Sequence, residues 1–163
     1  MKLKFPIQLL SVVFGVMLLS GCHSNTVYFA SHYAHSIEHV PAKGGNPQVL
    51  IPGPAMVMAL AVAPKEQRLY LADQISISRW RMDGHDAGAV GYAPRIQSMA
   101  VNEKAGRVYW TEQGQPPEEG RGMVMSSNLQ GGDRRVLVSN LYFPRVAVNQ
   151  PKGSCKKSPF FFT

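Results

Sequence analysis

Short apolar stretches return along the chain in a fixed order. An almost wholly apolar stretch from Met56 to Val62 is followed by a polar turn and by the segment 69–73, Leu-Tyr-Leu-Ala-Asp. The same order recurs in the stretch from Ile96 to Val101 and the segment 108–112, Val-Tyr-Trp-Thr-Glu. Apolar runs of this length, bounded by turn residues, are typical of β-strands. The pattern therefore predicts a chain of short strands.

The spacing within these stretches indicates an internal repeat. Tyr70 lies eight residues after Val62, and Tyr109 lies eight residues after Val101. A partial copy of the tyrosine segment begins at Val27, with Tyr28 in the tyrosine position. Each unit also has a turn glycine, and a count of 17 residues from each reaches a valine: Gly45 to Val62, Gly84 to Val101 and Gly131 to Val148. Because the variable spacing lies between the tyrosine and the glycine, we expect loops of different length between fixed strands.

Each unit is predicted to contain four strands. The apolar stretch is the first strand and the tyrosine segment is the second. Third strands are expected at 37–40, 75–82 and 123–129, and fourth strands at 48–51, 87–92 and 134–138. The apolar first strand would be buried on both faces; the alternative is a short buried helix between Pro54 and Pro64. Three strands of an earlier unit precede two full units, and the first strand of a later unit is expected from Arg145 to Asn149.

Four-stranded units that repeat near every 40 residues are typical of β-propellers. The segment 100–112 resembles the YWTD repeats of low-density-lipoprotein-receptor-type propellers, and the segment 128–137 is similar to their leucine-aspartate-glycine stretch. The resemblance covers Val27 to Gly153, but only the unit around residue 109 is close. It implies an all-β fold, a partial β-propeller of about two full four-stranded blades plus parts of two more, from a parent with six blades.

The resemblance also implies roles for the motif residues. Aromatic side chains of the motif would pack between blades, and its polar side chains would tie strands together by hydrogen bonds. These roles are structural rather than catalytic. The motif residues are Tyr28, Tyr70, Asp73, Tyr109, Trp110, Thr111 and Glu112, and the turn glycines are Gly45, Gly84 and Gly131.

The first 22 residues have the parts of an export signal. Lys2 and Lys4 precede a mostly apolar run at 9–19, which is too short to span a membrane. The closing residues 19–22, Leu-Ser-Gly-Cys, resemble the lipobox of bacterial lipoproteins. That resemblance implies a signal helix removed with residues 1–21, and lipid on Cys22 that tethers the protein to the cell envelope. By analogy with the sorting of bacterial lipoproteins, the lack of an aspartate after Cys22 favours an outer membrane. The alternative is an ordinary secretory signal with a chance cysteine.

The repeat breaks after Gly153. Ser154, Cys155 and Lys156 stand where the earlier units have arginine, an aliphatic residue and tyrosine. We therefore expect repeats over residues 22–153 and an aberrant tail over 154–163, caused by a frameshift or truncation of a longer protein. In the alternative, the strand at Arg145 to Asn149 pairs with the strand at Val27 and closes a ring of three units.

Charge argues against nucleic acid as a partner. The net charge of +7 falls to +5 without the lysines of the leader, and residues 22–149 carry only +2. A nucleic-acid-binding domain would be basic along one of its own faces. The two cysteines do not predict a disulfide, because a lipidated Cys22 leaves Cys155 without a partner.

Candidate sites of chemistry are few. The sequence has no phosphate-binding glycine loop, no Cys-x-x-Cys pair and no His-Glu-x-x-His motif. We assign no catalytic residue, no metal and no cofactor. The groups considered and set aside are His32, His35 and His39 as metal ligands, residues 83–86 as a calcium loop, Ser126 and Ser127 as nucleophiles, and Asn102 and Asn149 as ligands of an axial calcium.

The sequence thus favours a lipid-anchored envelope protein with a non-enzymatic binding or scaffold propeller. Its expected partners are the membrane, through the anchor, and a protein, peptide or glycan ligand. The alternative is part of a metal-dependent envelope hydrolase of propeller-lactonase type, with metal in the central channel. A third hypothesis is that the fragment has no activity of its own.

Overall fold

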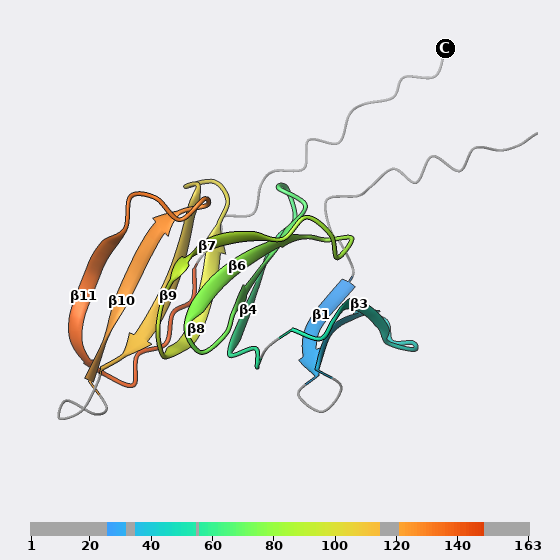
Figure 1. The fold of residues 1–163 in the computed structure, drawn as a ribbon, viewed down its shortest axis with the longest axis horizontal. Coiled ribbons are helices and arrows are strands. Elements are labelled where there is room, and N and C mark those ends of the chain that lie inside the picture. Colours follow the sequence, from blue (N-terminus) through green and yellow to red (C-terminus); the bar gives the residue numbers. More distant parts are fainter. Residues whose placement is uncertain (1–25, 32–34, 55, 115–120, 149–163) are drawn as a thin grey trace, which may run out of the picture.

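The computed structural model describes residues 26–31, 35–54, 56–114 and 121–148. Eleven β-strands in these residues form three antiparallel sheets of three, four and four strands (Figure 1). The described part of the chain contains no helix that is long and apolar enough to cross a membrane. The predicted signal helix and Cys22 lie outside the described residues.

Each sheet takes its strands in chain order, as a succession of hairpins. The first sheet contains β1 (Thr26–Ser31), β2 (Ser36–Pro41) and β3 (Gln48–Pro52). The second sheet contains β4 (Ala59–Ala63), β5 (Arg68–Ala72), β6 (Ser76–Arg81) and β7 (Gly88–Tyr92). The third sheet contains β8 (Ile96–Asn102), β9 (Arg107–Gln113), β10 (Arg121–Asn128) and β11 (Arg135–Tyr142).

The strand register repeats as the sequence spacing does. Ala61 of β4 lies opposite Tyr70 of β5, and Ala100 of β8 lies in the same way opposite Tyr109 of β9. Val62 and Val101 therefore occupy matching places in the second and third sheets. Because side chains alternate between the faces of a strand, this shared register gives the two sheets the same distribution of apolar residues.

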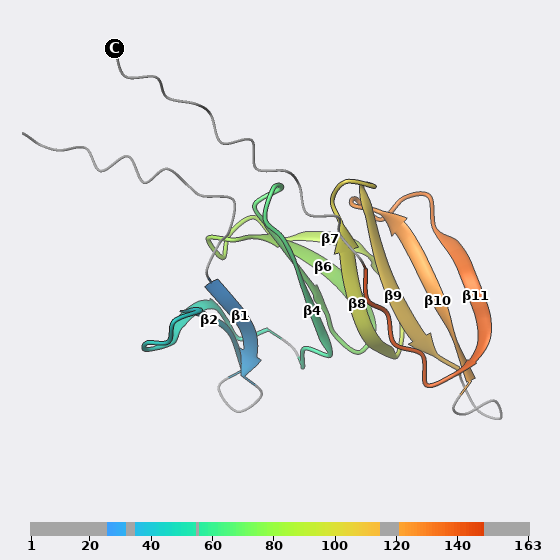
Figure 2. The same ribbon diagram turned by 180° about the vertical axis from the view of Figure 1, so that it is seen from behind.

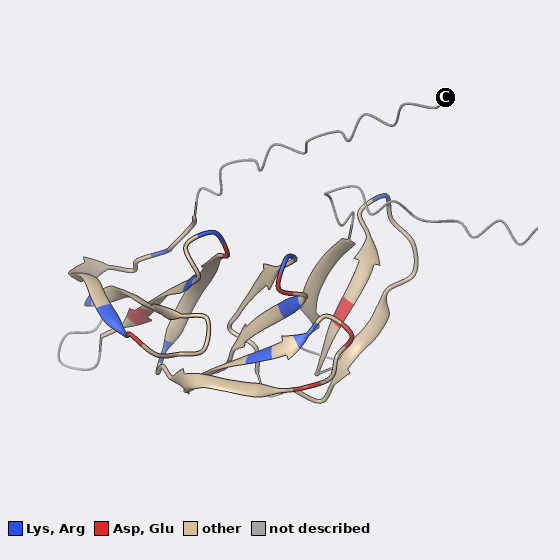
Figure 3. Ribbon diagram, turned by 90° about the horizontal axis from the view of Figure 1, so that it is seen from above, with Lys and Arg blue, Asp and Glu red and all other residues tan. Residues whose placement is uncertain are grey.

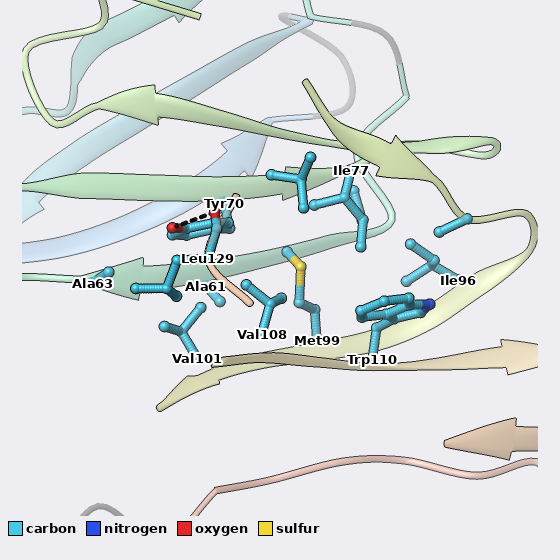
Figure 4. Packing of buried hydrophobic residues seen from close by; sticks show 13 residues of the cluster. Ala61, Ala63, Tyr70, Ile77, Ile96, Met99, Val101, Val108, Trp110 and Leu129 are labelled. Carbon is cyan, nitrogen blue, oxygen red and sulfur yellow. Dashed lines mark hydrogen bonds between the residues drawn. The ribbon is translucent and has the colours of Figure 1, made fainter. Parts of the chain in front are cut away.

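Two apolar clusters join the three sheets face to face. The larger cluster lies between the second and third sheets, where side chains from both interleave (Figure 4). It contains Ala61, Ala63, Tyr70, Ala72, Ile77, Val90, Ala93, Ile96, Met99, Val101, Val108, Trp110 and Leu129. The smaller cluster lies between the first and second sheets and contains Ile37, Ile51, Val57, Leu69 and Leu71. Full burial of one such aliphatic side chain stabilises the fold by about 1.5–3 kcal/mol.

The first strand of the second sheet has apolar contacts on both faces, as predicted. Ala61 and Ala63 belong to the larger cluster, whereas Leu60 and Val62 pack against the smaller one. The helix considered between Pro54 and Pro64 is wrong. The strand is shorter than expected, because it begins at Ala59 and the side chains of Met56 and Met58 are exposed.

The prediction of a further strand from Arg145 to Asn149 is wrong for its described part, because residues 144–148 form no strand. They run beside β8 (Figure 2), where the backbone N–H of Val146 donates to the Ser98 Oγ at 2.8 Å. A first strand needs a second strand as its backbone partner, and no described strand pairs with this segment. Closure of three units is also wrong, because β1 forms the edge of its sheet. Viewed from above, the sheets stand in an open arc (Figure 3).

Candidate functional site

The aromatic residues of the repeat lie at the faces between sheets. Tyr70 is fully buried, and its hydroxyl donates to the backbone carbonyl of Leu129 in the third sheet's hairpin at 3.2 Å (Figure 4). Burial raises the pKa of the Tyr70 hydroxyl, and the Glu66 carboxylate adds to that shift. Trp110 is buried in the same cluster from the opposite sheet. The tyrosine segment thus supplies contacts between sheets.

The other two tyrosines of the motif lie in less enclosed places. Tyr28 packs against the smaller cluster, and its ring stacks on His39 with the centroids 5.9 Å apart. Partial burial raises the pKa of its hydroxyl. Tyr109 is half-buried and lies on the face of the third sheet opposite to that of Val108 and Trp110. No described sheet covers that face.

The polar residues of the motif hold turns and strands. The Asp73 carboxylate accepts hydrogen bonds from the backbone N–H groups of Ile75 and Ser76 and from the Ser76 hydroxyl, at 2.7–2.9 Å. Thr111 is fully buried, and its hydroxyl lies 3.1 Å from the Ser98 hydroxyl of the neighbouring strand. Both residues tie one strand to the next.

Glu112 takes part in a contact between the second and third sheets. Its carboxylate accepts a hydrogen bond from the Trp110 indole at 2.7 Å and lies 3.6 Å from the Arg134 guanidinium. The same guanidinium stacks over the Trp110 ring at 5.0 Å and donates to the backbone carbonyl of Tyr92. The sequence analysis did not predict a role for Arg134, because in the sequence it is only a basic residue after a turn.

The turn glycines of the second and third sheets touch the preceding sheet. Gly84 and Gly131 have φ values of 84° and 93°, in the left-handed region that favours glycine. A Cβ at Gly84 would overlap the backbone carbonyl of Leu50, and a Cβ at Gly131 would overlap that of Val90. Leu50 and Val90 belong to the fourth strands of the preceding units. Gly45 has only Pro41 nearby, at 3.8 Å.

The residues that were set aside as ligands have structural partners. Asp83 accepts a hydrogen bond from the His85 backbone N–H, which lowers the pKa of that carboxyl, and Asp86 pairs with Arg68 at 2.7 Å. The Asn102 side chain accepts from the Ala105 backbone N–H at 3.0 Å. No group of three or more His, Cys, Asp or Glu within the described ranges could hold a metal ion.

The partners of the serines and histidines are also specific. Ser126 accepts from the Arg107 guanidinium at 2.9 Å, and Ser127 donates to the Asn128 carbonyl at 2.9 Å. His39 stacks on Tyr28. Cys22, His32, Asn149 and Cys155 lie outside the described residues.

A pocket of about 880 Å³ opens at one end of the second and third sheets. Its walls come from the segments that join second to third strands and fourth strands to the next sheet. We call it the inter-sheet pocket; it is lined by Met58, Gln74, Ile75, Tyr92, Pro94, Arg95, Ile96, Gln97, Gln113, Gly114, Tyr142 and Phe143. Sequence reasoning did not find it, because its residues come from five separate segments.

The inter-sheet pocket combines exposed apolar groups with amides and one cation. Ile75, Tyr92, Tyr142 and Phe143 each expose 60–69% of their surface. The side chains of Gln97 and Gln113 are hydrogen-bonded to each other at 3.3 Å. Large exposed apolar groups clustered around a few polar ones are typical of ligand-binding surfaces.

Arg95 is held in place by its backbone. Its N–H donates to the Gln74 carbonyl, and its carbonyl accepts from the Gln113 N–H, at 3.0 and 3.1 Å. Its φ of 53° places it in the left-handed region. The guanidinium donates to the Gly114 carbonyl at 2.9 Å, and no carboxylate of the described residues forms an ion pair with it. The pocket therefore offers a positioned positive charge.

Solved structures similar to this chain share its fold. A chain from a nidogen/laminin complex matches with a TM-score of 0.66 and 21% identity, covering 74% of this chain and 46% of that chain. A putative TolB from Agrobacterium tumefaciens matches with a TM-score of 0.60 and 13% identity, covering 71% and 46%. The TolB of Acinetobacter baumannii matches at 0.54 and 7%, covering 69% of this chain and 30% of that one. No protein-family description and no curated protein sequence matches the chain.

These similarities confirm the predicted fold class. The described residues form an all-β partial propeller of two four-stranded sheets and one three-stranded sheet. The chain spans just under half the length of the nidogen-complex and Agrobacterium TolB chains. Propellers support many functions, so the fold alone assigns none to this chain.

Proposed function

We propose that this protein is a lipid-anchored envelope protein whose propeller sheets form a non-enzymatic binding module. Its ligand is an extended protein segment that carries a carboxylate among apolar side chains. The observation that carries the ligand class is the inter-sheet pocket, in which Arg95 lies among exposed aromatic and aliphatic groups and forms no ion pair with a carboxylate of the described residues. Arginine binds carboxylates through strong charge-assisted hydrogen bonds.

Several observations support the binding role. Ile75 and Tyr142 expose 60% and 69% of their surface. A ligand that covers such apolar groups removes them from water, which stabilises the complex. The pocket lies on connecting segments held by rigid sheets, which is where binding residues concentrate. One of the similar chains belongs to a complex of nidogen with laminin, itself an assembly of proteins.

The lipid anchor rests on the leader sequence. Cys22 follows a basic start, a short apolar run and the residues Leu-Ser-Gly. Acyl chains on Cys22 would hold the module at an envelope membrane, and two chains suffice for durable anchoring. The break in the repeat after Gly153 supports the further proposal that the chain descends from a longer propeller.

Metabolic labelling tests the anchor. Cells that express the full chain are grown with radiolabelled palmitate, and we expect label on the wild-type protein and none on Cys22→Ser. The Cys155→Ser variant is the matched control and keeps the label. Equal labelling of Cys22→Ser and wild type would contradict the anchor.

A peptide panel tests the binding module. The probes are fluorescein-labelled ten-residue peptides with one aspartate between leucine or phenylalanine residues, the rest glycine and serine, and the readout is anisotropy with the full chain in detergent. We expect saturable binding that Arg95→Gln weakens at least tenfold and Arg95→Lys weakens less. Lys104→Gln, in an exposed turn away from the pocket, keeps wild-type affinity. If no peptide binds, or if Arg95→Gln binds as well as wild type, the proposed ligand class is wrong.

A further inference from the structure

At each end of the arc lies a sheet face that no further described sheet covers, and on the one at the C-terminal end the Val146 N–H donates to Ser98. We call the outer face of the first sheet the N-terminal face; opposite residues place Phe29, Glu38 and Val49 on it, with Val49 61% exposed. The outer face of the third sheet is the C-terminal face. Tyr109 lies on this face. Val124 and Val138, which are paired across β10 and β11, lie on it too. Apolar groups on both faces meet water in the isolated arc.

The N-terminal face has the turn glycine, and the C-terminal face has the fourth strand, of the contact that joins the other sheets. At each described junction, a turn glycine packs on a fourth-strand carbonyl of the preceding sheet, as Gly84 does on Leu50 and Gly131 on Val90. Gly45, the matching glycine of the first sheet, has no such carbonyl near it. The matching fourth strand of the third sheet, β11, exposes Val136, Leu137 and Val138 at 48–56%.

The two halves of a tyrosine contact, which is made at the junction of the second and third sheets, also lie at the two ends. Tyr70 donates to a carbonyl two residues before Gly131. Tyr109 occupies the Tyr70 position in the third sheet, where no described sheet follows. Two residues before Gly45 lies Lys43, whose carbonyl is the matching acceptor position in the first sheet.

The first strands show a third complementarity. Within the described residues, the first sheet has no first strand and β1 is its edge, whereas β4 and β8 supply that strand to the other sheets. Residues 144–148 lie beside β8 through the Val146–Ser98 hydrogen bond and have no strand partner. One end therefore lacks a first strand, and the other end has a segment in the position of one.

From these matches we propose that a second copy of this chain completes the propeller. The C-terminal face of each copy packs on the N-terminal face of the other, and residues 144–148 of each pair with β1 of the other. In the other sheets Val62 lies opposite Leu69 and Val101 opposite Val108. The same register would place Val148 of one copy opposite Val27 of the other. The described residues of one copy form three sheets, and closed propellers contain about 4–8 four-stranded blades. Two copies give six sheets, whereas one or three copies fall outside that range.

Symmetry makes this assembly self-limiting. The two junctions between copies are related by a two-fold axis, so the ring closes and leaves no free face. Each completed sheet then has four strands. This chain covers just under half of the nidogen-complex and Agrobacterium TolB chains.

The mass of the full chain in detergent, by light scattering with correction for the micelle, tests the stoichiometry. The expected protein mass is twice that of one mature chain, which mass spectrometry of the same sample gives. Val49→Lys places a charge in the proposed junction and is expected to raise the dimer dissociation constant at least tenfold. Ile75→Lys is the matched control, because Ile75 is equally exposed, at 60%, but lies in the inter-sheet pocket. A monomer, an open-ended polymer or a dimer unaffected by Val49→Lys would overturn the proposal.

Disulfide trapping tests the exchange of strands. Two single-cysteine chains, Val27→Cys and Val148→Cys, are mixed in a background with Cys22→Ser and Cys155→Ser, so that no bond can form within a chain. Oxidation is expected to give a disulfide-linked pair of the two chains. Val27→Cys mixed with Lys104→Cys is the control and stays unlinked. Equal linking in both mixtures, or none in the first, would contradict the pairing.

Discussion

At the scale of single residues, a few repeated positions join the sheets. Tyr70 spans the junction between the second and third sheets by a buried hydrogen bond to Leu129. Gly131 lets its hairpin approach the backbone of Val90 so closely that no side chain fits between them. The glycine contact occurs at both described junctions, with Gly84 on Leu50 and Gly131 on Val90, because the two junctions repeat the same geometry.

The replacement of Gly131 by alanine tests that close approach. Gly131→Ala adds a methyl group that overlaps the Val90 carbonyl, and we expect it to lower the free energy of unfolding by about 3 kcal/mol or more. Gly106→Ala is the control: its φ of 64° is also left-handed, but nothing lies within 4 Å of its added Cβ. Backbone strain alone should cost about 1 kcal/mol there. Urea unfolding at equal protein concentration measures both; equal losses would show that the hairpin does not dock.

At the scale of elements, the sequence predicted which segments form strands better than it predicted where those strands begin and end. The third strands at 75–82 and 123–129 correspond to β6 (Ser76–Arg81) and β10 (Arg121–Asn128). Fixed spacing of apolar residues sets strand identity, since a one-residue slip would move every side chain to the other face. The ends depend on tertiary context. β11 continues to Tyr142, well beyond the predicted residue 138, because Leu141 and Tyr142 still pair with β10.

Two features could not be predicted from the spacing of apolar residues. Residues 145–148 carry the apolar residues of a first strand, yet no second strand follows to pair with them in the described chain. The inter-sheet pocket brings together Gln74, Arg95 and Tyr142 from separate units. Each of these residues looks like an ordinary loop residue in the sequence, and only the stacking of the sheets places them around one cavity.

At the scale of the whole molecule, the fold is an arc of sheets that bury their faces against one another. The junction between the second and third sheets has the larger cluster, in which Trp110, Ile77 and Met99 meet (Figure 4). Each interior sheet face loses water through its neighbour, as in other repeated architectures whose units are stable only when stacked. The end faces leave apolar groups such as Val49 and Val138 exposed to water.

The contact of Tyr70 with Leu129 tests this arrangement most directly, because the two residues are 59 positions apart and belong to different sheets. The measurement is the nuclear Overhauser spectrum of the isotope-labelled full chain in detergent. The account predicts cross-peaks between the Tyr70 ring protons and the protons of Leu129. A well-dispersed spectrum of a folded chain that lacks these cross-peaks would contradict the packing of successive sheets face to face.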